Sequence, residues 1–145
     1  MDFSALTISD FKHSIPIQIR FSDCDMAGHV NNATVLTYYE TARIEFLFGI
    51  VGLDNDWKST GLILAHSEID YIEPVYLQDK IKACSRITRI GSKSFTIENI
   101  LVKTNEKKEV IASFASFVLV CMDYHKKESI EIPQPWKDKM KSAAR

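Results

Sequence analysis

The sequence predicts an α+β fold in which an antiparallel sheet wraps around one long central helix. Residues 33–48 repeat apolar side chains at helical spacing around much of the helix circumference, a pattern typical of a buried helix. The segments that follow have the character of strands separated by turns, as in an antiparallel meander. One buried helix followed by a meander indicates that the sheet wraps the helix.

The first predicted element is a strand over residues 15–21, where apolar and polar residues alternate with the two-residue period of a half-buried strand. Pro16 suits the start of that strand or an edge position. The helix over residues 33–48 comes next. Gly49 and Gly52 are expected to stop it, because glycine favours the end of a helix.

Four further strands are predicted, over residues 62–73, 80–90, 94–104 and 110–124. Pro74 ends the first of them, Gly91-Ser92 forms a turn or bulge, and polar residues 105–108 join the last two. The tail over residues 136–144 is expected to end in a short helix. No repeat or linker divides the chain, so residues 1–145 are predicted to form one domain.

Composition indicates a soluble globular protein, with 46% hydrophobic and 26% charged residues among 145. A net charge of -1 gives no support for a nucleic-acid or membrane-surface role. No apolar run approaches the roughly 20 residues of a membrane span, and no signal peptide is visible. Cys24, Cys84 and Cys121 are an odd set without CxxC spacing, which suits a reducing cytoplasm better than disulfides or a zinc site. We expect a cytoplasmic protein.

The segment from Arg20 to Arg43 carries the strongest indication of function. It runs from an apolar strand through a carboxylate-rich turn containing Gly28 into the helix. The start of a helix presents unpaired N–H groups and a partial positive charge, and Asp25 lies a few residues before it. Hydrolysis of an activated acyl group needs a carboxylate to attack or to activate water, and donors to stabilise the oxyanion.

The order of residues here, above all Gly28-His29-Val30-Asn31-Asn32, resembles the hotdog-fold thioesterases of the 4-hydroxybenzoyl-CoA thioesterase type, and most of all their acyl-CoA thioesterase branch. Ile69-Asp70-Tyr71-Ile72-Glu73-Pro74 with Asp79 after it, and Ile90-Gly91-Ser92-Lys93-Ser94, extend the resemblance over nearly the whole chain. The hotdog fold agrees with the helix and meander predicted above. The resemblance also implies a homodimer or a dimer-of-dimers homotetramer, and open sheet edges favour self-association in general.

The resemblance implies catalytic roles for two residues. Asp25 matches the family's catalytic carboxylate, acting as general base or as nucleophile, whereas Asp23 is left for a structural role. The backbone N–H of Asn32 matches the donor that binds the thioester oxygen. Related short-chain enzymes carry a histidine there, so only the backbone role is expected of Asn32.

Substrate-binding residues are expected around the same helix start and in one distant turn. Gly28, His29, Asn31 and Ala33 belong to the helix-start segment, and His29 is expected to order the loop rather than to catalyse. Lys93 lies where related enzymes place basic side chains on the CoA phosphates.

Glu40 is the reserve catalytic candidate, because another hotdog lineage uses a carboxylate on the helix. Its spacing from Arg43 also allows an ion pair on one face of the helix. The spacing therefore favours a structural role for Glu40.

We expect an acyl-CoA thioesterase that releases free CoA and a carboxylic acid, without metal or redox cofactor and without a nucleic-acid or membrane partner. Two alternatives remain open. An acyl-carrier-protein thioesterase would use the same chemistry on a protein-borne chain, and a non-catalytic acyl-CoA binding module would keep the fold without hydrolysis. The acyl chain length, and the choice between aromatic and aliphatic groups, also remain open.

Overall fold

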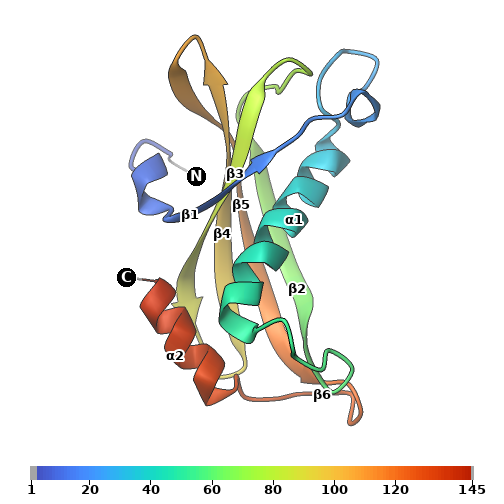
Figure 1. Ribbon diagram of the computed structural model, residues 1–145, viewed down its shortest axis with the longest axis vertical. Coiled ribbons are helices and arrows are strands. Elements are labelled where there is room, and N and C mark those ends of the chain that lie inside the picture. Colours follow the sequence, from blue (N-terminus) through green and yellow to red (C-terminus); the bar gives the residue numbers. More distant parts are fainter. Residues whose placement is uncertain (1–2, 145) are drawn as a thin grey trace.

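The structure, a computed structural model, describes residues 3–144, which form one antiparallel sheet with a long helix, α1 (Asn32–Val51), along one side of it (Figure 1). The strands along the sheet follow the order β1-β3-β4-β5-β2. They are β1 (His13–Ile17), β2 (Thr60–Tyr71), β3 (Lys80–Ile90), β4 (Ser94–Asn105) and β5 (Lys108–Asp123). The predicted α+β architecture is therefore confirmed.

Three short elements complete the fold. Two 3-10 helices, η1 (Ile8–Asp10) and η2 (Phe21–Asp23), flank β1. The strand β6 (Glu128–Ser129), which the sequence pattern did not predict, pairs with β5. The predicted tail helix is α2 (Gln134–Ala143), which buries Trp136 and Met140.

The predicted bounds of β1 and α1 need correction. The first strand ends at Ile17 instead of residue 21, because the Arg20 backbone N–H donates to the Asp23 carboxylate and the chain closes into η2. The helix continues through Gly49, which was expected to stop it, and ends at Val51. Gly52, with φ +90°, is the residue that terminates it, because residues with a Cβ rarely adopt a backbone conformation with such a positive φ.

The main core lies between α1 and the sheet. Tyr39 and Ala42 on the helix, and Ile97, Ala115 and Phe117 on the central strands, are completely buried there. A second, smaller cluster lies apart from it, where the N-terminal segment packs with β3, β4 and β5. It joins the residues Phe11, Cys84, Ile100, Val102 and Phe114.

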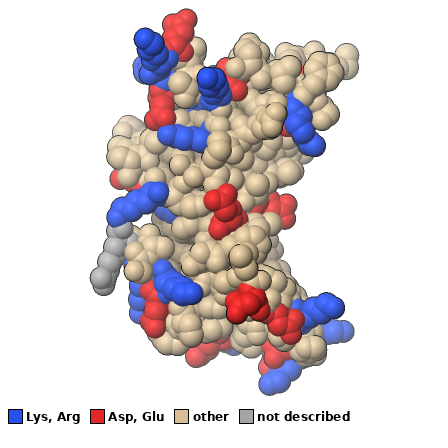
Figure 2. All heavy atoms as spheres, in the orientation of Figure 1, with Lys and Arg blue, Asp and Glu red and all other residues tan. Residues whose placement is uncertain are grey.

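Burial of the helix is one-sided. The predicted burial is correct for the face toward the sheet, but Leu36, Ile44 and Phe48 remain exposed on the other face. Lys, Arg, Asp and Glu are interspersed over the side of the molecule seen in Figure 2, with broad uncharged areas between them. Within residues 3–144, neither helix is long and apolar enough to cross a membrane.

The two glycines at the end of α1 provide a matched test of this geometry. Gly49→Ala should stabilise the fold by about 1 kcal/mol, since alanine is the better helix former and the added Cβ meets nothing within 4 Å. Gly52→Ala should destabilise it by roughly 1–3 kcal/mol, because its φ is positive. Urea unfolding of both variants measures the two effects. Equal effects at both positions would contradict the observed helix end.

Candidate functional site

The predicted catalytic segment forms a closed loop between η2 and α1. Cys24 and Val30 face each other across an antiparallel bridge. Within the loop, the Asp25 N–H donates to the His29 carbonyl at 2.8 Å, and the Gly28 N–H donates to the Asp25 carbonyl at 3.0 Å. Gly28 has φ +82°, so the turn itself requires glycine.

The Asp25 carboxylate is oriented by this loop. Its Oδ1 accepts the backbone N–H groups of Ala27 at 2.9 Å and His29 at 3.2 Å. The residue is exposed, and Oδ2 makes no hydrogen bond to any residue between 3 and 144. One oxygen is therefore held while the other is open to water or to a substrate.

The start of α1 leaves one backbone donor available. The Asn31 N–H donates to the Asp23 carbonyl at 2.8 Å, and the Asn31 side chain accepts the Ala33 N–H at 2.8 Å. The Asn32 N–H, between them, has no acceptor in the described part of the chain. Of the three predicted residues at this helix start, the geometry therefore leaves only Asn32 with a free donor for an oxyanion.

Asp23 joins the elements on both sides of the loop. Its side chain is 2% exposed and accepts the Tyr38 hydroxyl at 2.5 Å and the Arg20 backbone N–H at 2.9 Å. The Arg20 guanidinium also binds it, at 3.0 Å. Burial opposes the charge, but these donors outweigh burial, so the pKa of Asp23 lies below its usual value. The structural role predicted for Asp23 agrees with this geometry.

A cavity of about 230 Å³ opens beside the helix start. His29, Asn32 and Tyr71 line it together with residues of the loop between β2 and β3 and of the central strands. The Tyr71 hydroxyl donates to the Asn32 carbonyl at 3.1 Å. Tyr71 was not predicted as a site residue, although the motif Ile69–Pro74 that carries the resemblance contains it.

Hydrogen bonds and an ion pair hold the loop between β2 and β3 in place beside this cavity. The Val30 N–H donates to the Val75 carbonyl at 2.7 Å. Lys103, which is 7% exposed, donates to the Pro74 carbonyl at 2.8 Å and pairs with Glu73 at 3.2 Å. The ring of His29 packs edge-on against Tyr76, 5.0 Å between centroids. His29 therefore orders the loop through its backbone and ring contact.

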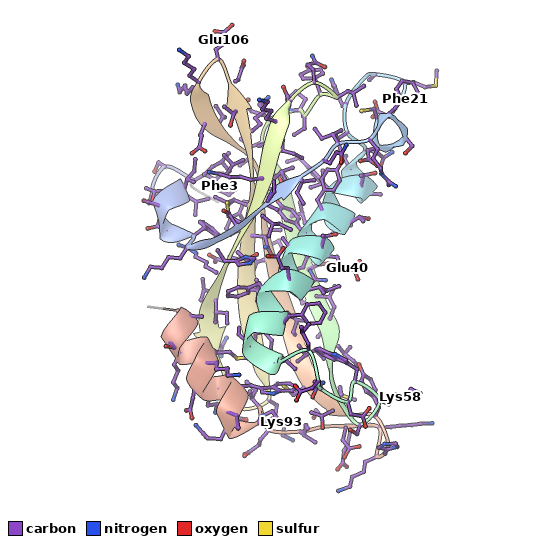
Figure 3. The ribbon with its side chains drawn as sticks, viewed as in Figure 1. Phe3, Phe21, Glu40, Lys58, Lys93 and Glu106 are labelled. Carbon is purple, nitrogen blue, oxygen red and sulfur yellow. The ribbon has the colours of Figure 1, made fainter. Side chains whose placement is uncertain are left out.

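Two predicted residues lie away from the loop. Lys93 lies at the end of the molecule opposite Phe21 and η2 (Figure 3). Glu40 projects outward from the middle of α1. The Glu40–Arg43 ion pair that the spacing allowed does not form, because Arg43 turns inward and stacks on the Phe117 ring, with Cζ 4.6 Å from its centroid.

Two of the three cysteines lie in the interior, and the third lies at the bridge that closes the loop. Cys84 and Cys121 are buried, and burial raises the pKa of each thiol to about 11. Cys24 is half-buried and lies next to the bridge to Val30. Between residues 3 and 144 no group of three or more His, Cys, Asp or Glu side chains is arranged to hold a metal ion.

Sequence comparison identifies the family. The profile of the thioesterase-like superfamily matches residues 19–141, which include the loop, the helix and all the long strands after it. The chain belongs to the thioesterase-like superfamily. This family is broader than the 4-hydroxybenzoyl-CoA type, which remains a prediction.

Individual members of the thioesterase-like superfamily are distant from this chain. The uncharacterized YsmA of Bacillus subtilis is 31% identical over 81 residues, 56% of this chain and 54% of YsmA, so the chain spans about half the length of that relative. The long-chain acyl-CoA thioesterase FadM of Escherichia coli is 24% identical over 131 residues, 86% of this chain and 93% of FadM.

A solved thioesterase shares the fold over nearly its full length. The Thermus thermophilus thioesterase complexed with coenzyme A and Zn is 28% identical, with a TM-score of 0.77 over 90% of this chain and 98% of that one. The predicted hotdog fold is thus confirmed. Family and fold together place the chain among thioester hydrolases.

We expect Asp23→Asn to destabilise this thioesterase-family chain by roughly 1–3 kcal/mol at pH 7, because buried donors lose a charged acceptor. The low pKa of Asp23 adds stability above about pH 4, and that stability is lost as the pH falls through the folded-state value. The variant should therefore lose less stability than wild type below about pH 4. Urea unfolding from pH 7 to pH 3 measures the difference.

Asp25→Asn is the matched control, because Asp25 is exposed and asparagine can still accept the two loop N–H groups. It should change stability by less than about 0.5 kcal/mol. A loss as large as that of Asp23→Asn would contradict the distinction between the two aspartates.

Proposed function

We propose that this protein hydrolyses an acyl-CoA thioester to free CoA and a carboxylic acid. The observation that carries the proposal is the presence, in one closed segment, of an oriented, exposed Asp25 carboxylate and of the unpaired Asn32 N–H at the start of α1. A carboxylate and a preorganised amide donor are the two groups that attack on a thioester carbonyl requires.

In the proposed reaction, Asp25 either takes a proton from the attacking water or attacks the carbonyl carbon itself, forming an anhydride that water then opens. Negative charge develops on the carbonyl oxygen, where the Asn32 N–H stabilises it. One such donor is typically worth about 3 kcal/mol.

In both routes the carbon–sulfur bond breaks when the tetrahedral adduct collapses. With Asp25 as base, this releases the acid, and the proton that Asp25 took from water passes to the CoA sulfur. With Asp25 as nucleophile, it leaves the anhydride and CoA thiolate, which takes a proton from water, and a second water then releases the acid from the anhydride.

The choice of CoA as the carrier is supported by the relatives. FadM is named a long-chain acyl-CoA thioesterase, and the Thermus thermophilus enzyme was solved with coenzyme A. The placement of Lys93 is the observation that favours the second candidate, an acyl-carrier-protein thioesterase. In one chain Lys93 lies at the end of the molecule opposite Phe21, so a single chain gives no support for the contact with CoA phosphates that is expected of Lys93. A non-catalytic acyl-CoA binding module is the remaining alternative.

We also propose that two copies pair through β2. This strand is an edge of the sheet, and its residues 63–68 are all exposed. The exposed apolar residues of α1 lie on the helix beside it. Antiparallel pairing of two β2 edges would set the Lys93 end of one copy beside the Asp25 end of the other. Such a homodimer, alone or paired into a tetramer, brings together the residues that one chain separates.

Asp25→Asn should abolish turnover, a loss of at least a hundredfold, while substrate binding and the fold persist. The reason is that an amide is neither a base nor a nucleophile at neutral pH. Thiol release from short, medium, long and aromatic acyl-CoAs, and from a matched acyl-carrier-protein thioester, measures turnover and ranks the two carriers.

Glu40→Gln is the comparison variant, since Glu40 is the reserve candidate and projects from the middle of α1. It should retain turnover within a few-fold of wild type. Full activity of Asp25→Asn combined with an inactive Glu40→Gln would move the catalytic role to Glu40. Acyl-CoA binding without hydrolysis by the wild type would favour the binding module.

Ile63→Lys should weaken self-association, because it places a charge on the exposed part of β2. Sedimentation velocity should give a dimer or tetramer for wild type and a larger monomer fraction for the variant. Thr104→Lys, on the distant hairpin between β4 and β5, is the control and should leave the assembly unchanged. A wild type that sediments as a monomer would remove this part of the proposal.

A further inference from the structure

Strand β4 carries a lysine on the face that it packs against the core. Successive side chains of a strand point to opposite faces, so one face of β4 carries Phe95, Ile97, Leu101 and Lys103. The three apolar residues belong to the main core and are at most 1% exposed, and Lys103 is only 7% exposed. Lysine is rarely buried unless it is paired, so the contacts of Lys103 should explain its position.

These contacts lead to the loop between β2 and β3, residues 72–79. The Lys103 Nζ donates to the Pro74 carbonyl at 2.8 Å and lies 3.2 Å from a carboxylate oxygen of Glu73. It also lies 5.9 Å from the centroid of the Tyr76 ring, within the range of a cation–π contact. One ammonium group on the sheet therefore contacts three residues of the loop.

The loop is attached to the sheet in two steps. The N–H groups of Ile72 and Glu73 both donate to the Ala112 carbonyl at 2.9 Å, which attaches the start of the loop to β5. Pro74 has no N–H to donate, and its carbonyl accepts the Lys103 ammonium instead. The lysine thus extends the attachment from the start of the loop toward its middle.

A backbone contact connects this part of the loop to the start of α1. Val75 follows Pro74, and its carbonyl accepts the Val30 N–H at 2.7 Å. Val30 is 5% exposed and lies two residues before Asn32, whose N–H is the proposed oxyanion donor. The position of the Pro74 carbonyl therefore bears on the position of the helix start.

A second contact connects the loop to Asp25. The Tyr76 ring packs edge-on against the His29 ring, with 5.0 Å between centroids, and the two residues also form an antiparallel bridge. The His29 N–H donates in turn to the Asp25 Oδ1 at 3.2 Å. Both proposed reactive groups are therefore connected to the loop that Lys103 contacts.

A buried ion pair adds little net stability, because removing the charges from water costs about as much as their attraction returns. The contacts of Lys103 support a different role. We propose that Lys103 is a positioning residue, which holds loop residues 73–76 against the segment that carries Asp25 and Asn32. The effect of Lys103 on turnover rests on the proposed function, whereas its hold on the segment does not.

Residue-resolved hydrogen exchange measures this hold without a substrate. Lys103→Met keeps an unbranched side chain and removes the ammonium group. In this variant the exchange rate of the Val30 amide should rise at least tenfold more than that of the Ile97 amide in the core of β4. Lys103→Gln, with a side chain one atom shorter than lysine, should show the same difference, and it carries the test if Lys103→Met does not fold.

Lys82→Met is the matched control, because Lys82 forms an ion pair with Glu109 on the same sheet, at 2.6 Å, and does not contact the loop. It should leave the exchange of both amides unchanged. Equal acceleration of Val30 and Ile97 in the Lys103 variants would indicate a general loss of stability and would overturn the inference. Unchanged exchange of Val30 would overturn it as well.

Steady-state kinetics on the acyl-CoA that wild type hydrolyses fastest measures the consequence for the site. In the Lys103 variants kcat should fall at least tenfold, because small displacements of reacting groups reduce the rate steeply. KM should stay within threefold, since Lys103 is not among the residues that line the cavity of about 230 Å³. Lys82→Met should keep both constants. A raised KM with unchanged kcat would place Lys103 in substrate binding and overturn the inference.

The two measurements separate this inference from the proposed function. If wild type hydrolyses no thioester and Val30 still exchanges selectively faster in the Lys103 variants, the hold is supported and the proposed function fails. If wild type hydrolyses an acyl-CoA and the Lys103 variants keep its kcat, the inference is overturned and the proposed function stands.

Discussion

The buried Asp23 carboxylate holds the functional end of the molecule together. It accepts donors from the chain leaving β1 and from Tyr38 inside α1, while its own carbonyl caps the Asn31 N–H. The chain leaving β1, the helix α1 and its N-cap Asn31 therefore meet at one residue. The burial that makes the contact costly also makes it strong, because hydrogen bonds to a charged group gain strength away from water. Asp25 and the Asn32 N–H owe their positions to this contact, although neither touches the Asp23 carboxylate.

Much of the architecture was predictable because its determinants are local. Alternation and helical spacing identified α1 and the four long strands, and β3 has the predicted bounds of residues 80–90. The errors arose where a side chain competed with the backbone pattern, as at η2, where Asp23 binds the Arg20 N–H and ends β1 early. Gly49 was misjudged because glycine alone does not stop a helix, and only Gly52 adopts the positive φ that does.

The candidate site was predictable only where it is contiguous in sequence. Asp25, Gly28 and Asn32 belong to one short segment, so their order indicated a common site. Tyr71 and Lys103 reach the same region from strands distant in sequence, and no spacing rule predicts such contacts. Arg43 illustrates the opposite error. Its spacing from Glu40 fitted an ion pair, but sequence spacing does not tell which way a long side chain turns. In the structure the Arg43 side chain points inward and stacks on the Phe117 ring.

The buried thiols have a consequence for a protein whose proposed product is itself a thiol. Disulfide exchange requires a thiolate, and a pKa near 11 leaves Cys84 and Cys121 almost entirely protonated at neutral pH. Neither is therefore expected to form a mixed disulfide with the CoA released by turnover. A colorimetric thiol reagent also needs a thiolate, so Cys84 and Cys121 should react slowly with it. In the folded protein it would react mainly with the half-buried Cys24.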